Sequence, residues 1–201
     1  GNELMELEPK AKIKLMGAGV MARVTNLNWI KGIRTYQELL FVVRGMETSE
    51  MDPDKIARTV VDSPLLIFLS KSHEGNPPYH FRLELKSKKD LGQKSVFLKK
   101  VASKIEILSG RKLINTTENY EFELRLIENK LGNCNIMVKL YTLKDTRFSY
   151  RRDVMPTSIK PVNAALTAAL SKEYMKEDAQ VLDPFCGVGT MLIERHKAVR
   201  A

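Results

Sequence analysis

Apolar and polar side chains alternate most regularly in the middle third of the chain. Residues 81–86, 120–126 and 136–140 each place an apolar side chain at every second position, which predicts β-strands with one exposed face. Gly132-Asn133 lies between the last two segments and is typical of a tight turn. We therefore expect those two strands to form a hairpin.

A helix is expected between the first two of these strands. Along residues 94–108 apolar side chains recur at the spacing of one helical face, and Gly110 follows as a candidate C-terminal cap. One strand, a helix and two further strands predict a small α+β sandwich. The expected apolar stripe of the helix consists of Phe97, Val101, Ile105 and Leu108.

The N-terminal third shows a weaker pattern. Val20–Val24 and Glu38–Val43 are expected strands around a turn. Asp52-Pro53 predicts the start of a helix, because aspartate caps a helix and proline fits its first position. Ser63-Pro64 is expected to end that helix. The apolar run Leu65–Leu69 is consistent with a strand or with one turn of buried helix.

The C-terminal quarter begins with a charged linker over residues 145–157. The next helix is expected to be capped near Ser158 and to carry Pro161 in its first turn. Ala179–Leu182 is a short apolar run that predicts a buried parallel strand.

A glycine turn follows this strand. Gly187 and Gly189 permit positive φ, and a helix that begins near Thr190 offers N–H groups to an anionic ligand. A phosphate-binding loop would need Gly-Lys-Ser/Thr, and a dinucleotide fingerprint would need glycine where Leu192 stands. S-adenosylmethionine remains as a candidate, with an acid for its ribose expected about 20 residues further on. An ordinary turn without a ligand is the alternative.

The run Asp183–Thr190 resembles motif I of class I methyltransferases that act on exocyclic amino groups of bases. Tyr150–Arg152 and Ser158–Leu166 resemble the segment that leads into the same domain. The combination is similar to RNA methyltransferases with a THUMP domain, which modify guanosine N2 in tRNA or ribosomal RNA. The resemblance is tight over about residues 147–195, looser over 80–146 and weakest over 1–75.

This resemblance implies an α+β fold in three parts. We expect a ferredoxin-like region over residues 1–75, a THUMP-like α/β sandwich over 76–150, and over 151–201 a linker with the first helix–strand–helix of a Rossmann-like methyltransferase domain. Such a chain is expected to be the front portion of a longer enzyme and to be inactive alone, with no catalytic residue of its own. The residues implied in binding the cofactor are Ser158, Lys160, Pro161, Asp183, Pro184, Phe185, Gly187, Gly189 and Thr190.

An open sheet with one strand would leave apolar faces and an edge uncovered. We therefore expect residues 158–201 to pack on the preceding domain or on a second copy of the chain, which makes self-association possible.

The charge distribution adds a candidate partner. The net charge is +9, and residues 82–112 hold ten basic against three acidic side chains. A stripe of this kind suits a polyanion such as structured tRNA or rRNA, although it is also typical of a solvated surface. For the arginines of the linker the alternative is pairing with Asp145 and Asp153. The predicted RNA contacts are Lys86, Lys88, Lys89, Lys99, Lys100, Lys104, Arg147, Arg151 and Arg152.

Asn76–Tyr79 spells Asn-Pro-Pro-Tyr, the catalytic tetrapeptide of base amino-methyltransferases. That tetrapeptide should directly follow a buried strand, and here six mostly polar residues, Ser70–Gly75, separate it from Leu65–Leu69. A loop is therefore expected. Two alternatives stay open: a DNA amino-methyltransferase with permuted motifs, and a non-catalytic RNA-binding module.

The remaining features concern location. No segment approaches about 18 consecutive apolar residues, and the acidic first residues do not resemble a signal peptide. Cys134 and Cys186 are expected to be unpaired, which favours a cytoplasmic location. The histidines at positions 73, 80 and 196 are too scattered to predict a metal site.

Overall fold

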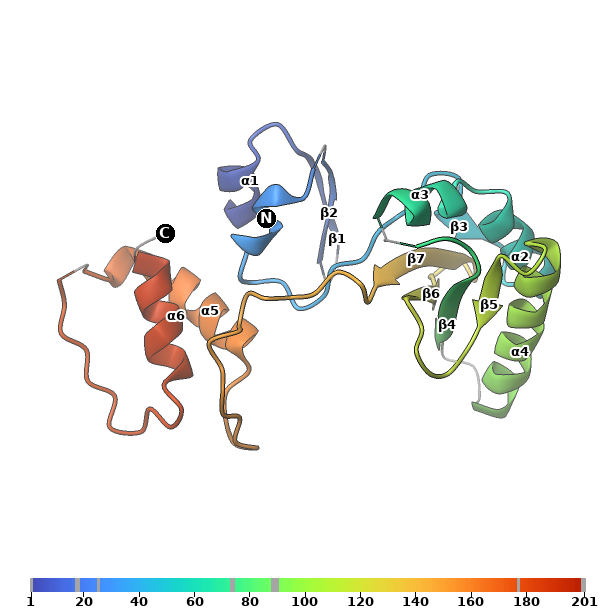
Figure 1. Ribbon diagram of the computed structural model, residues 1–201. Helices are drawn as coiled ribbons and strands as arrows, with labels where there is room; N and C mark the ends of the chain where they lie inside the picture. Colours follow the sequence, from blue (N-terminus) through green and yellow to red (C-terminus); the bar gives the residue numbers. More distant parts are fainter. Residues whose placement is uncertain are drawn as a thin grey trace. The chain divides into compact units, whose positions relative to one another are not determined.

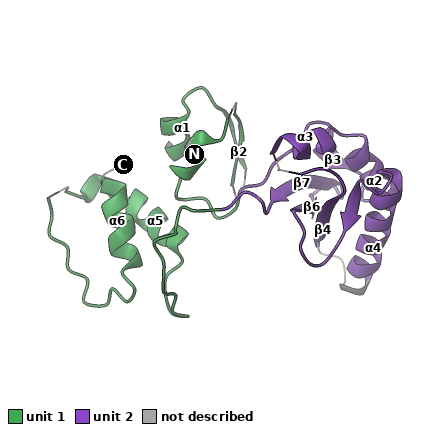
Figure 2. Ribbon diagram, viewed as in Figure 1, with its two compact units in different colours: residues 1–38, 145–201 green, residues 39–144 purple. Residues whose placement is uncertain are grey.

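The computed structural model describes residues 2–16, 19–24, 26–72, 75–87, 91–176 and 178–199. The chain divides into two compact units, which are coloured separately in Figure 2. Residues 39–144 form one unit, and residues 1–38 together with 145–201 form the other. The first unit is thus an insertion between the two segments that build the second.

The unit of residues 39–144 is built on a mixed five-stranded sheet with the order β3-β7-β6-β4-β5. Strand β4 runs parallel to β5 and β6, whereas β7 pairs antiparallel with β6 and with β3. The hairpin expected from the alternating pattern is confirmed as β6 and β7. The strands are β3 (Thr48–Ser49), β4 (Tyr79–Lys86), β5 (Leu113–Asn115), β6 (Phe122–Glu128) and β7 (Cys134–Leu140).

The helices described in this unit are α2 (Pro53–Val61), α3 (Leu65–Ser72) and α4 (Leu91–Leu108). Helices α2 and α4 pack side by side and cover the sheet (Figure 1). Their apolar faces and the inner face of the strands form one hydrophobic core, and every member of that core lies within residues 39–144. Fully buried members include Ile56, Val60, Phe81, Val101, Ile105, Phe122, Leu124 and Ile136.

The predicted start of α2 is confirmed. Asp52 is its N-cap, and Oδ1 of Asp52 accepts hydrogen bonds of 3.0 Å from the backbone N–H groups of Asp54 and Lys55. These bonds satisfy donors that a helix start leaves without acceptors. The run after Pro64 is α3, so the helical alternative for Leu65–Leu69 is the observed one.

The stripe predicted for α4 is confirmed at Val101 and Ile105, which are fully buried, and at Phe97, which packs against the core. Leu108 is 45% exposed, because the helix ends there and Gly110 adopts φ +59° as the chain turns away. Ser109 is buried beyond the helix end instead.

The second unit contains α1 (Asn2–Leu7), the strands β1 (Lys12–Met16) and β2 (Gly19–Arg23), and a 3₁₀ turn over Asn28–Lys31. From its C-terminal segment come α5 (Pro161–Leu170), a 3₁₀ turn over Lys172–Tyr174, and α6 (Thr190–Val199). Strands β1 and β2 pair antiparallel in a sheet of their own, and α5 packs against α6.

The ferredoxin-like arrangement expected over residues 1–75 is wrong. Among the residues that the structure describes, strands β1 and β2 pair only with each other, whereas β3 joins the five-stranded sheet with α2 and α3 beside it. Glu38–Val43 is not a continuous strand either, since Phe41 alone forms a β-bridge, to Val138. The sequence pattern identified apolar segments correctly but not their partners, which lie far away in the sequence.

The strand expected at Ala179–Leu182 is also wrong. These residues form no regular secondary structure, and Val181 and Leu182 are 46% and 90% exposed. A parallel strand needs neighbouring strands to receive its backbone hydrogen bonds. Within the described part of this unit only β1 and β2 are strands, and they satisfy each other.

None of the described helices is both long and apolar enough to cross a membrane.

Candidate cofactor site

The glycine turn before α6 is held by a short series of local hydrogen bonds. Oδ1 of Asp183 accepts the N–H of Phe185 at 2.9 Å, and the carbonyl of Cys186 accepts the N–H of Gly189 at 2.8 Å. The N–H of Ile193 then donates to the carbonyl of Gly189 at 3.0 Å, which begins the helix. The turn predicted from the sequence is therefore present, followed by a helix at the expected residue.

Gly187 and Gly189 have φ values of +54° and +74°, a conformation that L side chains rarely adopt. A Cβ atom added to either glycine would have no atom within 4 Å. The requirement for glycine is thus conformational, and the backbone of the turn borders open space. Phe185, at the tip of the turn, is 92% exposed.

Thr190 is the first residue of α6 and is only 2% exposed. Its hydroxyl Oγ1 is buried and has no hydrogen-bond partner among the described residues. Burying a hydroxyl without a partner costs about 1–3 kcal/mol, so such groups are rare unless something else satisfies them. A ligand atom at the start of α6 would supply the missing partner.

The predicted upstream residues lie at the start of α5. Lys160 is the N-cap, Pro161 is the first helical residue, and the Lys160 carbonyl accepts the N–H of Ala164 at 3.1 Å. Ser158 does not cap the helix as expected. Its Oγ accepts the N–H of Met155 at 3.2 Å, which closes a turn ahead of the helix.

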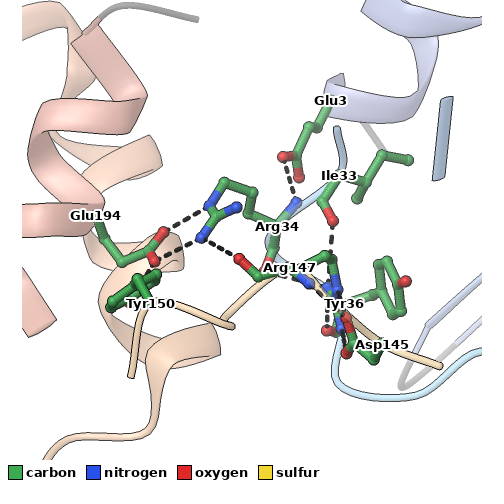
Figure 3. Close-up of polar contacts among 8 residues, drawn as sticks. All are labelled: Glu3, Ile33, Arg34, Tyr36, Asp145, Arg147, Tyr150 and Glu194. Atoms are coloured by element: carbon green, nitrogen blue, oxygen red, sulfur yellow. Dashed lines mark hydrogen bonds and ion pairs between the residues drawn. The ribbon is translucent and has the colours of Figure 1, made fainter. Parts of the chain in front are cut away.

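A buried polar cluster around Glu194 holds α6 in place (Figure 3). Glu194 lies one helical turn after Thr190. Glu194 is 1% exposed, and its carboxylate accepts hydrogen bonds of 2.7 Å from both Nε and Nη2 of Arg34. The hydroxyl of Tyr150 donates to the same carboxylate at 2.5 Å. The guanidinium of Arg34 thus forms a bidentate pair with a helix residue that lies 160 positions later in the chain.

Arg147 lies inside the unit, with 6% of its surface exposed. Its guanidinium donates to both carboxylate oxygens of Asp145 and to the backbone carbonyls of Ile33 and Tyr36, at 2.7–3.2 Å. It also lies over the Tyr36 ring, 3.4 Å from the centroid. These contacts correspond to the intramolecular alternative that the sequence left open, and a phosphate cannot reach this guanidinium.

The charge states in the cluster follow from these contacts. The hydrogen bond from Arg34 to Glu194 raises the pKa of Arg34, and the hydrogen bond from Arg147 lowers the pKa of Asp145. Burial, together with the neighbouring Glu194 carboxylate, raises the pKa of Tyr150. Tyr150 therefore keeps its proton and remains a hydrogen-bond donor to Glu194 at neutral pH.

One comparison with known proteins bears on the C-terminal segment. Residues 149–200 match the family described as UPF0020, the RMKL-like methyltransferase domain. The matched residues contain the glycine turn, α5, α6, Tyr150 and Glu194. This segment of the chain is therefore related to methyltransferase domains. A search of curated proteins found no match.

A search of solved structures found similarity to a crystal structure of a 4-thiouridine synthetase in complex with RNA and with bound ATP. The sequence identity is 15% and the TM-score is 0.43. The similarity covers 68% of this chain and 35% of that protein, so the chain spans about a third of its length.

The predicted RNA-contacting lysines lie in the unit of residues 39–144. Lys86 ends β4, and Lys99 and Lys100 are on α4; all three side chains are exposed. Lys104 is partly buried and forms an ion pair with Asp54 of α2. Lys88 and Lys89 lie outside the described residues.

The other two linker arginines differ from Arg147. Arg152 is exposed. Arg151 is partly buried, and its Nε atom has no hydrogen-bond partner among the described residues. Both belong to the same compact unit as the glycine turn.

The first three residues of the tetrapeptide Asn76–Tyr79 form a loop that leads into β4. Tyr79 is the first residue of that strand and is 1% exposed, and its hydroxyl donates to the carbonyl of Gly75 at 3.2 Å. A ring packed in the core cannot stack on a flipped base. The structure therefore argues against a methyltransferase that uses this tetrapeptide.

Sequence reasoning missed Arg34, Glu194 and the role of Tyr150. Tyr150 lies in a segment noted for its resemblance to methyltransferases, but no local pattern indicated what it contacts. Glu194 looked like an ordinary polar residue of a short helix, and Arg34 lies in a stretch without a motif. Arg34 and Glu194 lie 160 positions apart in the sequence, so only the folded structure shows that they are in contact.

Proposed function

We propose that this chain is part of an S-adenosylmethionine-dependent RNA methyltransferase that methylates an exocyclic base amine, with guanine N2 in tRNA or rRNA as the target. The observation that carries the proposal is the glycine turn before α6, where Thr190 Oγ1 is buried and has no partner in the described part of the chain. Its location within a segment that matches a methyltransferase domain family supports the choice of cofactor.

In this proposal the residues of the turn hold the methionine end of the cofactor. The N–H groups of the first turn of α6 face its carboxylate, because helix starts attract anions. The Thr190 hydroxyl provides one further hydrogen bond, and Asp183–Gly189 shape the loop around it. Ser158, Lys160 and Pro161 remain proposed contacts at the start of α5.

The unit of residues 39–144 is proposed to be THUMP-like and to bind structured RNA. Lys86, Lys99 and Lys100 are exposed cations of this unit, and the chain as a whole carries a net charge of +9. Phosphate contacts from lysines hold RNA without reading its sequence. Arg151 and Arg152 are proposed contacts of the other unit, whereas Arg147 is removed from the set by its burial.

The cofactor part is tested by Thr190→Val, which removes one hydroxyl at nearly constant shape. Because that hydroxyl is buried and unpartnered without a ligand, its removal should raise the free energy of unfolding by about 1 kcal/mol. The same change should weaken S-adenosylmethionine binding by about threefold to tenfold, since one ligand hydrogen bond is lost. Thermal denaturation and isothermal titration calorimetry measure the two effects.

Thr167→Val is the matched control. Thr167 lies on α5, is exposed, and donates to the carbonyl of Asn163 at 3.0 Å. It should leave cofactor affinity unchanged and should not stabilise the protein. If the full-length protein binds RNA but not S-adenosylmethionine, the proposal fails in favour of a non-catalytic RNA-binding module.

The RNA part is tested by titrating the chain with labelled tRNA, an rRNA hairpin and duplex DNA at several salt concentrations. Replacing Lys86, Lys99 and Lys100 by Gln should reduce the slope of log K against log salt by about 2–3, one per phosphate contact. The control variant, with Lys10, Lys12 and Lys14 of the other unit replaced by Gln, loses the same charge. Equal slopes for the two variants would mean that only net charge attracts RNA.

A further inference from the structure

The buried cluster around Glu194 lies close to the proposed cofactor contacts along α6. Glu194 follows Thr190 by four residues, so one helical turn separates the two side chains on the same face of the helix. The helix between them is continuous. A constraint on the position or rotation of Glu194 is therefore transmitted directly to the first turn of α6.

Arg34 applies such a constraint. Two nitrogens of its planar guanidinium bind Glu194 at 2.7 Å each, and a bidentate pair fixes direction as well as distance. The Tyr150 hydroxyl contacts the same carboxylate at 2.5 Å. Glu194 is thus held from two segments, which together limit both rotation and sliding of α6.

Arg34 is itself held firmly by neighbours on two sides. Its backbone N–H donates to Glu3 at 2.7 Å, and its Nη2 donates to the carbonyl of Arg147 at 3.0 Å. Arg147 in turn donates to the carbonyls of Ile33 and Tyr36 (Figure 3). Residues 33–36 are therefore held in place by hydrogen bonds to Glu3 and Arg147.

We infer that Arg34 is a positioning residue for the cofactor site. The two hydrogen bonds from Arg34 to Glu194 fix the orientation of α6. That orientation sets the direction in which the first turn of α6 presents its N–H groups and the Thr190 hydroxyl. Arg34 does not touch the ligand and acts only through Glu194. The identity of the ligand in this inference rests on the proposed function. The mechanical link between residues 33–36 and α6 does not depend on it.

Hydrogen exchange of the 201-residue chain without any ligand tests the link. In Arg34→Ala the amides of residues 190–199 should exchange about tenfold faster, within the range of coupling free energies between sites. Amides of β4, β6 and β7 should keep their rates. Unchanged rates in α6 would overturn the inference.

A double variant separates positioning from stability. Replacing Arg34 by Met and Glu194 by Leu removes both charges, and apolar replacement of a buried ion pair often preserves stability. The double variant should unfold at about the parent temperature yet bind S-adenosylmethionine about tenfold more weakly. Parent affinity in a stable double variant would mean that the pair only supports the fold, and would overturn the inference.

Arg125→Ala is the matched control. Arg125 forms a buried pair with Glu123 at 2.7 Å, but in the other unit. It should lower stability without changing cofactor affinity or exchange in α6. If the full-length protein does not bind S-adenosylmethionine, the proposed function fails, and the exchange rates of Arg34→Ala alone decide whether Arg34 positions α6.

Discussion

Arg147 and Arg152 belong to one charged stretch, but only Arg152 is exposed. Arg147 satisfies backbone carbonyls of residues 33–36 and the Asp145 carboxylate at the same time. A guanidinium can do this because it carries five N–H donors in a rigid plane, whereas a lysine ammonium has three on a flexible stem. Arginine therefore stabilises the fold through internal hydrogen bonds at position 147, whereas at position 152 its side chain is exposed and available to a partner.

The two cysteines differ in the same way and give a prediction at this scale. Cys134 is fully buried on β7, and burial raises its pKa to about 12, whereas Cys186 is exposed in the glycine turn. Because the thiolate is the reactive form, one thiol of the folded chain should react with a disulfide reagent at pH 8, and two after denaturation. Two rapid equivalents in the folded chain would contradict the burial of Cys134.

The sign of the accompanying pH effect follows from the raised pKa. The folded state retains the Cys134 proton more strongly than the unfolded state does. The associated stability is complete below the ordinary pKa of a thiol, about 8.5, and is lost as pH rises from there toward about 12. Cys134→Ala should remove this part of the alkaline destabilisation, which denaturation at pH 7 and pH 10 would measure.

At the scale of elements, local signals in the sequence predicted well whatever depends on neighbouring residues. The α2 cap at Asp52, the stripe on α4 and the β6–β7 hairpin each depend on contacts within one or two elements. Strand β5 has only three residues, too few for a periodic pattern, and was missed. The prediction of a strand at Ala179–Leu182 was wrong because a local pattern of apolar residues does not show whether neighbouring strands are present to pair with it.

For the candidate site the same distinction holds. Gly187, Gly189 and Thr190 were found because a turn and a helix start are encoded within a few residues. The pair between Arg34 and Glu194 joins residues 160 positions apart, and no periodicity reaches across that distance. Its members were therefore invisible until the fold was known.

The cap of α2 yields a prediction for this element. Asp52→Ala removes the acceptor of two backbone hydrogen bonds and should lower the free energy of unfolding by about 1 kcal/mol. Asp62→Ala at the other end of α2 is the control, since a negative charge is unfavourable at a helix C-terminus. It should be neutral or slightly stabilising in urea denaturation. Equal losses would show that the Asp52 side chain is not a cap.

For the whole molecule, the separate core of residues 39–144 has a thermodynamic consequence. All of its buried members come from that unit, so its unfolding need not involve residues 1–38 or 145–201. We expect two transitions in scanning calorimetry. Leu124→Ala, at a fully buried position, should destabilise one of them by about 2–5 kcal/mol and leave the other in place. A single transition that moves as a whole would contradict this division.

The control for that experiment is a change in the other unit. Ala168 is fully buried on α5, and Ala168→Gly should shift only the transition that Leu124→Ala leaves unchanged. The expected loss is about 1 kcal/mol, from the poorer helix propensity of glycine.

The β-bridge between Phe41 and Val138 has a consequence for the order of events during synthesis. A ribosome adding about 5–20 residues per second needs roughly 10–30 s to travel the 160 residues from Arg34 to Glu194. Residues 39–144 emerge earlier, and the backbone bonds of 2.7 and 2.9 Å at the bridge then tie the two ends of that segment together. With these two ends tied together, the effective loop between Arg34 and Glu194 is shorter. The entropic cost of bringing Arg34 and Glu194 together is therefore lower by roughly 1 kcal/mol. Folding of residues 39–144 before residue 194 is synthesised would therefore make the later contact between Arg34 and Glu194 easier to form.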